Sequence, residues 1–96
     1  MRFLSVTLGQ VVISRAGRDV GRKFIVINVV DNIYVQISDG ELRRIEKPKK
    51  KKIKHLEPTG QFAEAVLEKL KNSSRISNSD IRKALAGVEG TLENKE

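Results

Sequence analysis

The sequence predicts a mainly β protein with a helical C-terminal part: a small antiparallel β-barrel of about five strands followed by two short helices. Two observations support this fold class. Before Pro58 the apolar runs are short, rich in β-branched residues and separated by turn residues, which is typical of strands. After Pro58 the apolar residues recur at helical spacing. We therefore divide the 96 residues into a barrel domain, residues 1–59, and a helical C-terminal appendage with a frayed end, residues 60–96.

The barrel domain contains five candidate strands, separated by tight turns. The run at residues 24–27 is continuously apolar, which indicates a strand buried on both sides. Residues 31–32 are expected to form a tight two-residue hairpin link, because asparagine tolerates a positive φ. In the strand after this link, Ile33, Val35 and Ile37 share one face, which indicates a half-buried strand. The candidate strands span residues 10–14, 22–30, 33–37, 41–45 and 51–56.

The first predicted helix spans about residues 61–71. Phe62, Val66 and Leu70 form one apolar stripe along it. Residues 59–60 are expected to begin this helix. The stripe favours packing on the barrel or on the second helix, and a docking surface for a protein partner or a second copy is the alternative.

The second predicted helix begins after a capping box. Ser77 and Asp80 have the spacing of this motif. Gly87 and Gly90 are expected to end the helix, and residues 91–96 to fray. The apolar face of the helix carries Ile81, Ala84 and Leu85.

The positive charge of the chain is concentrated in one segment. Residues 43–55 hold eight Lys or Arg and one acid, Glu46, so this segment alone carries a charge of +7. The whole chain also has a net charge of +7, so the remaining basic and acidic residues balance. A patch of this density indicates a phosphate-rich partner, and nucleic acid is the leading candidate. A simply solvated loop is the alternative for the lysines at 49–52.

The composition does not support an enzyme. The chain has no nucleophile–base pair at motif spacing, no GxxxxGK[ST] phosphate loop and no acidic cluster for a metal. The absence of cysteine excludes disulfides and thiolate metal sites. His55 is the only histidine, and a packed or strand-capping role is favoured over a metal ligand. We therefore predict no catalytic residue, no metal site and no cofactor.

The chain is expected to be cytoplasmic. No apolar stretch approaches the roughly 20 residues that cross a bilayer. Residues 1–6 lack the apolar region of a signal peptide. We expect no membrane partner, although binding of anionic lipid or DNA through charge alone remains an alternative.

A glycine pattern surrounds the loop between the first two strands. Gly9 enters the first strand, Gly17 lies eight residues later, and Gly21 four residues beyond that. Glycine allows such a loop to adopt a positive φ or to approach another surface closely. Asp19 is placed to pair with one of the cations of its own loop. Four basic residues crowd this loop: Arg15, Arg18, Arg22 and Lys23.

This pattern resembles the KOW motif of RNA-binding proteins, including ribosomal proteins and bacterial transcription-elongation factors. Residues 50–59 (KKKIKHLEPT) and 27–35 (INVVDNIYV) are similar to the KOW domain of a group of archaeal and eukaryotic large-subunit ribosomal proteins. The resemblance covers roughly residues 7–59 and implies an SH3-like barrel whose KOW loop and basic strands contact RNA. Residues 61–96 do not match that group. We therefore expect a bacterial KOW-domain relative with its own helical appendage.

We predict a non-catalytic RNA-binding module that is ribosome-associated or binds structured RNA through phosphate contacts. Ribosomal proteins are further candidate partners, and a monomer is favoured. The alternative is a protein-interaction adaptor of a transcription or translation complex, using the barrel and the helical tail. Tyr34 is the candidate for base stacking. Gly9, Gly17 and Gly21 are the motif-shaping residues. The candidate RNA-binding residues are Arg15, Arg18, Arg22, Lys23, Arg43, Arg44, Lys47, Lys49, Lys50, Lys51, Lys52, Lys54 and His55.

Overall fold

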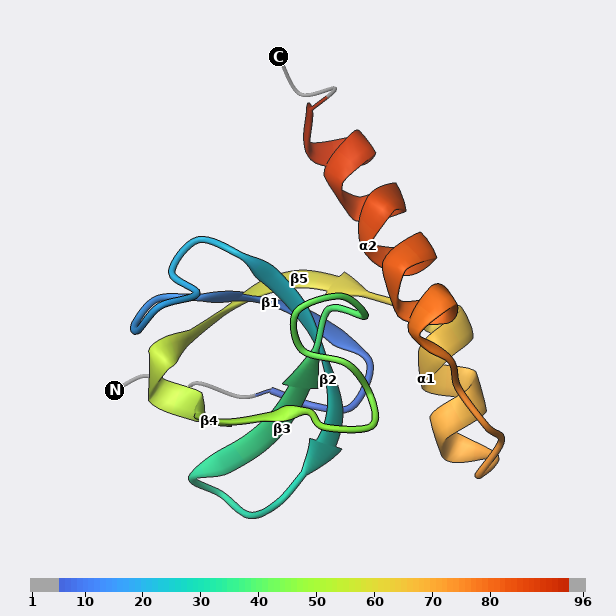
Figure 1. Ribbon diagram of the computed structural model, residues 1–96, viewed down its shortest axis with the longest axis horizontal. Coiled ribbons are helices and arrows are strands. Elements are labelled where there is room, and N and C mark those ends of the chain that lie inside the picture. The colour runs from blue at the N-terminus through green and yellow to red at the C-terminus, as the bar shows by residue number, and fades with distance from the viewer. Residues whose placement is uncertain (1–5, 94–96) are drawn as a thin grey trace.

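The computed structural model describes residues 6–93, with side chains for residues 6–88, and contains a curved five-stranded sheet followed by two helices (Figure 1). This arrangement confirms the predicted fold class. Residues 1–5, considered above for a signal peptide, and residues 94–96 of the expected frayed end lie outside the described residues. The elements are β1 (Gln10–Ser14), β2 (Lys23–Val29), β3 (Tyr34–Ser38), β4 (Lys49–Lys52), the 3-10 helix η1 (Ile53–His55), β5 (Leu56–Phe62), α1 (Glu64–Lys71) and α2 (Asn78–Glu93).

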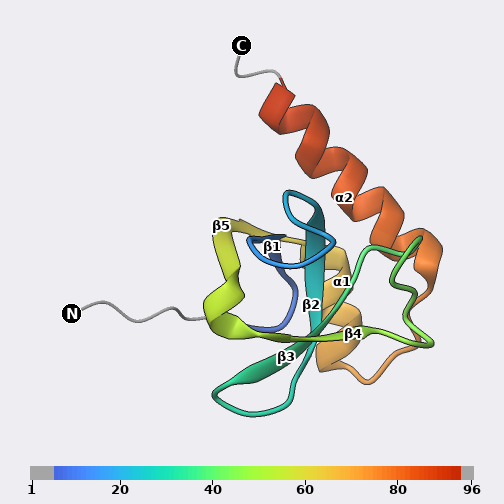
Figure 2. The same ribbon diagram turned by 60° about the vertical axis from the view of Figure 1, so that its left-hand side comes forward.

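The sheet is antiparallel at every pairing, with strand order β4-β3-β2-β1-β5. β4 and β5 are therefore the two edges, and η1 joins them directly in the sequence. Both views show the sheet rolling up into a barrel, with η1 joining these two edges at one end (Figures 1 and 2). α1 and α2 lie together on one side of this barrel.

The sheet buries both of its faces. One core fills the barrel, and the other joins the sheet to the helices, with Val11 and Ile25 packing against Val66, Ile81 and Leu85. The predicted burial of β2 on both sides is therefore confirmed. The barrel core consists of Val6, Val12, Phe24, Val26, Val35, Ile37 and Leu56.

The expected strand at residues 41–45 is wrong. These residues belong to a loop between β3 and β4, residues 39–48. Asp39 Oδ1 accepts hydrogen bonds from the backbone N–H groups of Glu41 and Arg43, both at 2.9 Å. Because the Asp39 side chain supplies local partners for these groups, the backbone turns instead of extending into a ladder. The last predicted strand is also divided, between the end of β4, η1 and the start of β5.

The hairpin between β2 and β3 differs from the expected tight turn. Its link spans residues 30–33, and Asn32 does not adopt a positive φ. Asp31 Oδ1 instead accepts the N–H groups of Ile33 and Tyr34, each at 2.8 Å. This side-chain turn replaces the backbone turn. It also leaves Ile33 53% exposed, outside the buried face to which it was assigned.

The first helix begins later than predicted, because β5 continues to Phe62. β5 pairs with β1, and Thr59 Oγ1 donates to a β1 carbonyl at 2.8 Å, so the residues expected to begin the helix are extended. Phe62 is consequently exposed instead of lying on the apolar stripe. Val66 is buried, as predicted, and Leu70 packs at the edge of the same core.

The second helix begins as predicted and ends later. Ser77 Oγ accepts the N–H of Asp80 at 3.1 Å, and Asp80 Oδ2 accepts the N–H of Ser77 at 3.0 Å, which is the reciprocal capping box. The predicted stop at Gly87 and Gly90 is wrong, because α2 continues to Glu93. A glycine inside a helix costs about 1 kcal/mol relative to alanine, which the adjoining turns can outweigh.

α1 docks on the sheet at Gly9. The φ of Gly9 is +79°, and a Cβ atom at this position would lie 2.6 Å from Leu67 Cβ. The Gly9 carbonyl accepts the N–H of Ala63 at 2.8 Å, immediately before α1 begins. Gly9 therefore shapes the contact between the barrel and the helix as well as the entry to β1.

We expect Gly9→Ala to lower the free energy of unfolding by about 2–4 kcal/mol. The alanine would be held at a strained positive φ, and its Cβ atom would also crowd Leu67. Gly60→Ala is the matched control, since Gly60 also has a positive φ of 83° but has open space around it. The control should lose about 1–2 kcal/mol from backbone strain alone. Urea unfolding followed by circular dichroism measures both variants, and equal losses would contradict the close packing of α1 on Gly9.

Candidate nucleic-acid interface

The lysine-rich segment forms the edge strand β4. Its register places Lys50 opposite Gln36 and Lys52 opposite Tyr34. Directly opposite residues point to the same face of a sheet. Since the neighbouring Val35 is in the barrel core, these four side chains lie on the outside of the barrel. We call Tyr34, Lys50 and Lys52 the outer basic face.

Tyr34 lies among cations on this face. Lys50 Nζ is 4.6 Å from the centre of the Tyr34 ring, which is a cation–π contact. A nucleobase stacking on that side of the ring would have to displace the ammonium group. Base stacking by Tyr34 therefore stays a prediction.

Lys51 points the other way from its neighbours. It is buried, and its Nζ donates to the carbonyl of Ala16 in the loop between β1 and β2 at 2.6 Å. A Cβ atom at Gly17 would lie 3.2 Å from this ammonium, so the glycine makes room for it. The charge of Lys51 thus fastens the KOW loop, residues 15–22, to β4.

A second set of predicted residues belongs to the KOW loop and to η1, which follows β4 directly (Figures 1 and 2). The Arg15 guanidinium forms an ion pair with Glu57 of β5. The backbone N–H of Arg15 donates to the backbone carbonyl of His55 at 2.8 Å. Arg18 and Lys54 are exposed. Neither forms an ion pair with another described residue. Arg15 therefore lies next to η1, the segment that carries Lys54 and joins β4 to β5.

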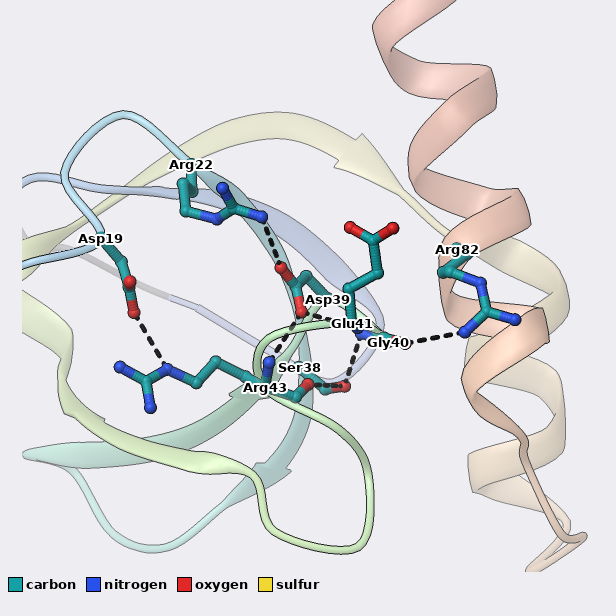
Figure 3. A network of polar contacts seen from close by, with 8 residues as sticks. All are labelled: Asp19, Arg22, Ser38, Asp39, Gly40, Glu41, Arg43 and Arg82. Carbon is teal, nitrogen blue, oxygen red and sulfur yellow. Dashed lines mark hydrogen bonds and ion pairs between the residues drawn. The ribbon is translucent and has the colours of Figure 1, made fainter.

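Two other predicted cations are engaged by buried carboxylates (Figure 3). Arg22 Nη2 lies 3.1 Å from Asp39 Oδ2, and Arg43 Nε lies 3.0 Å from Asp19 Oδ2. Asp19 was expected to pair with a cation of its own loop, but it pairs with the β3–β4 loop. The KOW loop supplies the cation of the first ion pair and the carboxylate of the second. Together the two ion pairs hold the KOW loop against residues 39–48.

Asp39 is the centre of this network. Burial opposes ionisation of its carboxyl, but hydrogen bonds from two backbone N–H groups of its own loop and from the Arg22 guanidinium outweigh burial. The pKa of Asp39 is therefore held below its ordinary value. The carboxylate is thus stabilised in the charged form that organises the loop.

The rest of the β3–β4 loop is tied to α2 through Asn78. Asn78 Oδ1 accepts the N–H of Ile45 at 2.9 Å, and its Nδ2 donates to Glu46 at 3.0 Å. The hydrogen bond from Asn78 lowers the pKa of Glu46. Arg44 lies 3.8 Å from Glu46 in an exposed ion pair, and Lys47 is exposed. These two predicted cations belong to the β3–β4 loop and not to β4.

Sequence reasoning missed Arg82. Its Nη1 donates to the carbonyl of Gly40 at 2.8 Å (Figure 3), and it lines a cleft of about 490 Å³ between the loops and α2. An arginine at an exposed helix position is common, so nothing in the sequence predicts that this one contacts Gly40 and lines a cleft. The cleft is lined by both basic and acidic residues, among them Arg22, Lys23, Arg82, Asp39 and Glu41.

Two structural absences hold for residues 6–93. No three acidic, histidine or cysteine side chains gather in this range in a way that could hold a metal ion. No helix in it combines the length and the apolar content needed to span a bilayer.

We expect Asp39→Asn to destabilise the chain by about 1–3 kcal/mol at neutral pH, because Arg22 loses its buried partner. The pKa of Asp39 is lowered on folding, so its stabilisation is present above the unfolded pKa of about 3.9 and is lost as the pH falls through the folded value. The stability difference between wild type and Asp39→Asn should therefore shrink on acidification. Urea unfolding at several pH values tests this, with the exposed Glu41→Gln as control. A difference that stays constant down to the lowest pH would contradict the assignment.

Comparison with known proteins relates the chain to archaeal ribosomal proteins. No family model matches it. Large ribosomal subunit protein eL14 of Desulfurococcus amylolyticus is 34% identical over 55 residues, covering 57% of this chain and 57% of the relative. The protein of the same name from Pyrobaculum arsenaticum is 37% identical over 59 residues, covering 62% and 57%. The chain thus spans 57% of the length of each of these two relatives.

A third relative extends the match beyond the barrel. Large ribosomal subunit protein eL14 of Pyrobaculum calidifontis is 30% identical over 80 residues, covering 83% of this chain and 71% of the relative. A match of this length includes part of the helical region, contrary to our expectation for residues 61–96. The relatives are archaeal, so the expected bacterial origin is not supported. The chain belongs to the family of large ribosomal subunit proteins eL14.

Proposed function

We propose that this chain is a non-catalytic, cytoplasmic RNA-binding protein that associates with the large ribosomal subunit through ribosomal RNA. The observation that carries the proposal is the outer basic face on the barrel of an eL14 family member. Its lysines project from an edge strand, where no other strand of the described sheet covers them. The printed names of the relatives support the same assignment, since they are large ribosomal subunit proteins.

The exposed cations are the ones we assign to phosphate contacts. Arg22, Arg43 and Lys51 have internal partners, so we assign them the task of holding the loops in place. A phosphate ligand would have to compete with those partners. Exposed cations without such partners can exchange their counterions for phosphates and gain the free energy of counterion release. The assigned residues are the exposed Arg18, Lys50 and Lys54, together with the partly exposed Lys52 on the outer basic face.

The adaptor alternative is less well supported. A protein partner that adds a strand would pair with a free sheet edge, and lysines along an edge strand are a common defence against such pairing. β4 consists of four consecutive lysines. The helical stripe is used for packing on the sheet, and Val66 and Ile81 are buried there. The relatives' names also favour the ribosome over a transcription complex.

The double variant Lys50→Gln, Lys52→Gln should weaken RNA binding and reduce its dependence on salt. Losing two phosphate contacts lowers the slope of log affinity against log salt by about 1.4–1.8. The matched control is Lys71→Gln, Lys83→Gln, which removes the same charge from exposed positions on α1 and α2. Fluorescence anisotropy with transcribed large-subunit ribosomal RNA gives both slopes. Equal slopes for the two double variants would rule out the outer basic face as the RNA contact.

Competition binding tests the choice of partner. We expect the chain to prefer large-subunit ribosomal RNA over small-subunit ribosomal RNA, duplex DNA and vesicles of anionic lipid at physiological salt. The reason is that fixed loops present their cations in one geometry, which fits some phosphate arrangements better than others. Equal affinity for all four polyanions would favour the alternative of binding through charge alone.

A further inference from the structure

The hairpin tip between β2 and β3, residues 29–33, exposes apolar side chains. Val29, Val30 and Ile33 are 41%, 44% and 53% exposed. A single exposed apolar residue is ordinary, but three within five residues of one protruding loop indicate a contact surface. Figures 1 and 2 show this loop projecting beyond β4, at the end of the barrel away from α2.

The tip is held in one conformation. Asp31 Oδ1 accepts the N–H groups of Ile33 and Tyr34, and the Val30 N–H donates to the Tyr34 carbonyl at 3.1 Å. The Ile33 carbonyl accepts the N–H of Ile53 at 2.8 Å, which fastens the tip to the end of β4. The backbone hydrogen bonds also lower the pKa of Asp31. Because the loop is already ordered, a partner gains contact with its apolar side chains at little entropic cost.

The tip adjoins the outer basic face. Tyr34 follows the tip directly and pairs in register with Lys52, while Lys50 lies over its ring. The one acid of the tip, Asp31, directs a carboxylate oxygen to its own backbone. An apolar protein surface seated here would leave the neighbouring lysines without anionic partners. A nucleic acid offers phosphates to the lysines and sugar and base surfaces to the tip.

We propose that the tip lies in the minor groove of an RNA helix while Lys50 and Lys52 contact the flanking phosphates. The minor groove of A-form RNA is wide and shallow and exposes riboses and base edges, whereas its major groove is too deep and narrow for side chains. A rigid tip with apolar side chains matches that open groove in shape and chemistry. This assignment rests on the proposed RNA-binding function and adds double-stranded RNA as its substrate class.

The test separates apolar contact from charge. Val30→Ser, Ile33→Ser removes apolar area and no charge, so affinity for an RNA duplex of about 16 base pairs should fall about tenfold or more with an unchanged salt slope. The matched control is Leu42→Ser, Phe62→Ser, which alters residues 62% and 44% exposed outside the tip and the KOW loop. Circular dichroism and urea unfolding verify that both double variants are folded.

Each outcome bears on the assignment. Affinity for the duplex that is unchanged in Val30→Ser, Ile33→Ser, or reduced equally in the control, overturns the tip contact while leaving RNA binding by the wild type intact. An equal loss on a single strand of the same length overturns the minor-groove assignment, because an unpaired strand has no such groove. Failure of the wild type to bind any RNA overturns the proposed function itself.

Discussion

The two-sided packing of β1 and β2 is the constraint on which the rest of the molecule depends. Successive residues of a strand point to opposite faces, so Val12 and Phe24 fill the barrel while Val11 and Ile25 receive the helices. The register joins Val11 to Ile25 and Val12 to Phe24, which keeps like faces together. A slip of one residue would exchange the two cores, so the packing on each side stabilises the register required by the other.

This arrangement determines which part of the barrel stays exposed. The helices cover one face of β1 and β2, whereas the lysine-rich edge strand and η1 lie away from them in Figure 1. Gly21 and Arg22, at the end of the KOW loop, line the cleft that faces α2. Lys51 fastens the KOW loop from inside, and buried Asp39 and Asp19 fasten it from the β3–β4 loop (Figure 3). A dense basic sequence is thus divided by the fold into cations that organise loops and cations that remain exposed to a ligand.

The successes and failures of sequence reasoning have separate causes. The capping box at Ser77 and the burial of β2 on both sides were predicted because each depends on residues close together in the chain. Residues 41–45 were predicted as a strand because they follow the turn residues Asp39 and Gly40, whereas the hydrogen bonds of the Asp39 side chain make the backbone turn again. Phe62 was assigned to a helix because it has helical spacing with Val66 and Leu70 in the sequence. The pairing of β5 with β1, which keeps Phe62 in a strand, joins residues far apart in the chain and could not be predicted from that spacing.

The sequence alone determined the fold class, the glycine pattern of the KOW loop and the location of the excess charge in residues 43–55. These follow from local periodicity, backbone freedom and composition, which need no knowledge of distant contacts. The tertiary structure decided that alternate lysines of β4 have opposite roles, that Asp19 pairs with Arg43, and that Arg82 reaches Gly40. Each depends on segments far apart in the chain, whose meeting is set by the strand register and by the docking of α1 and α2.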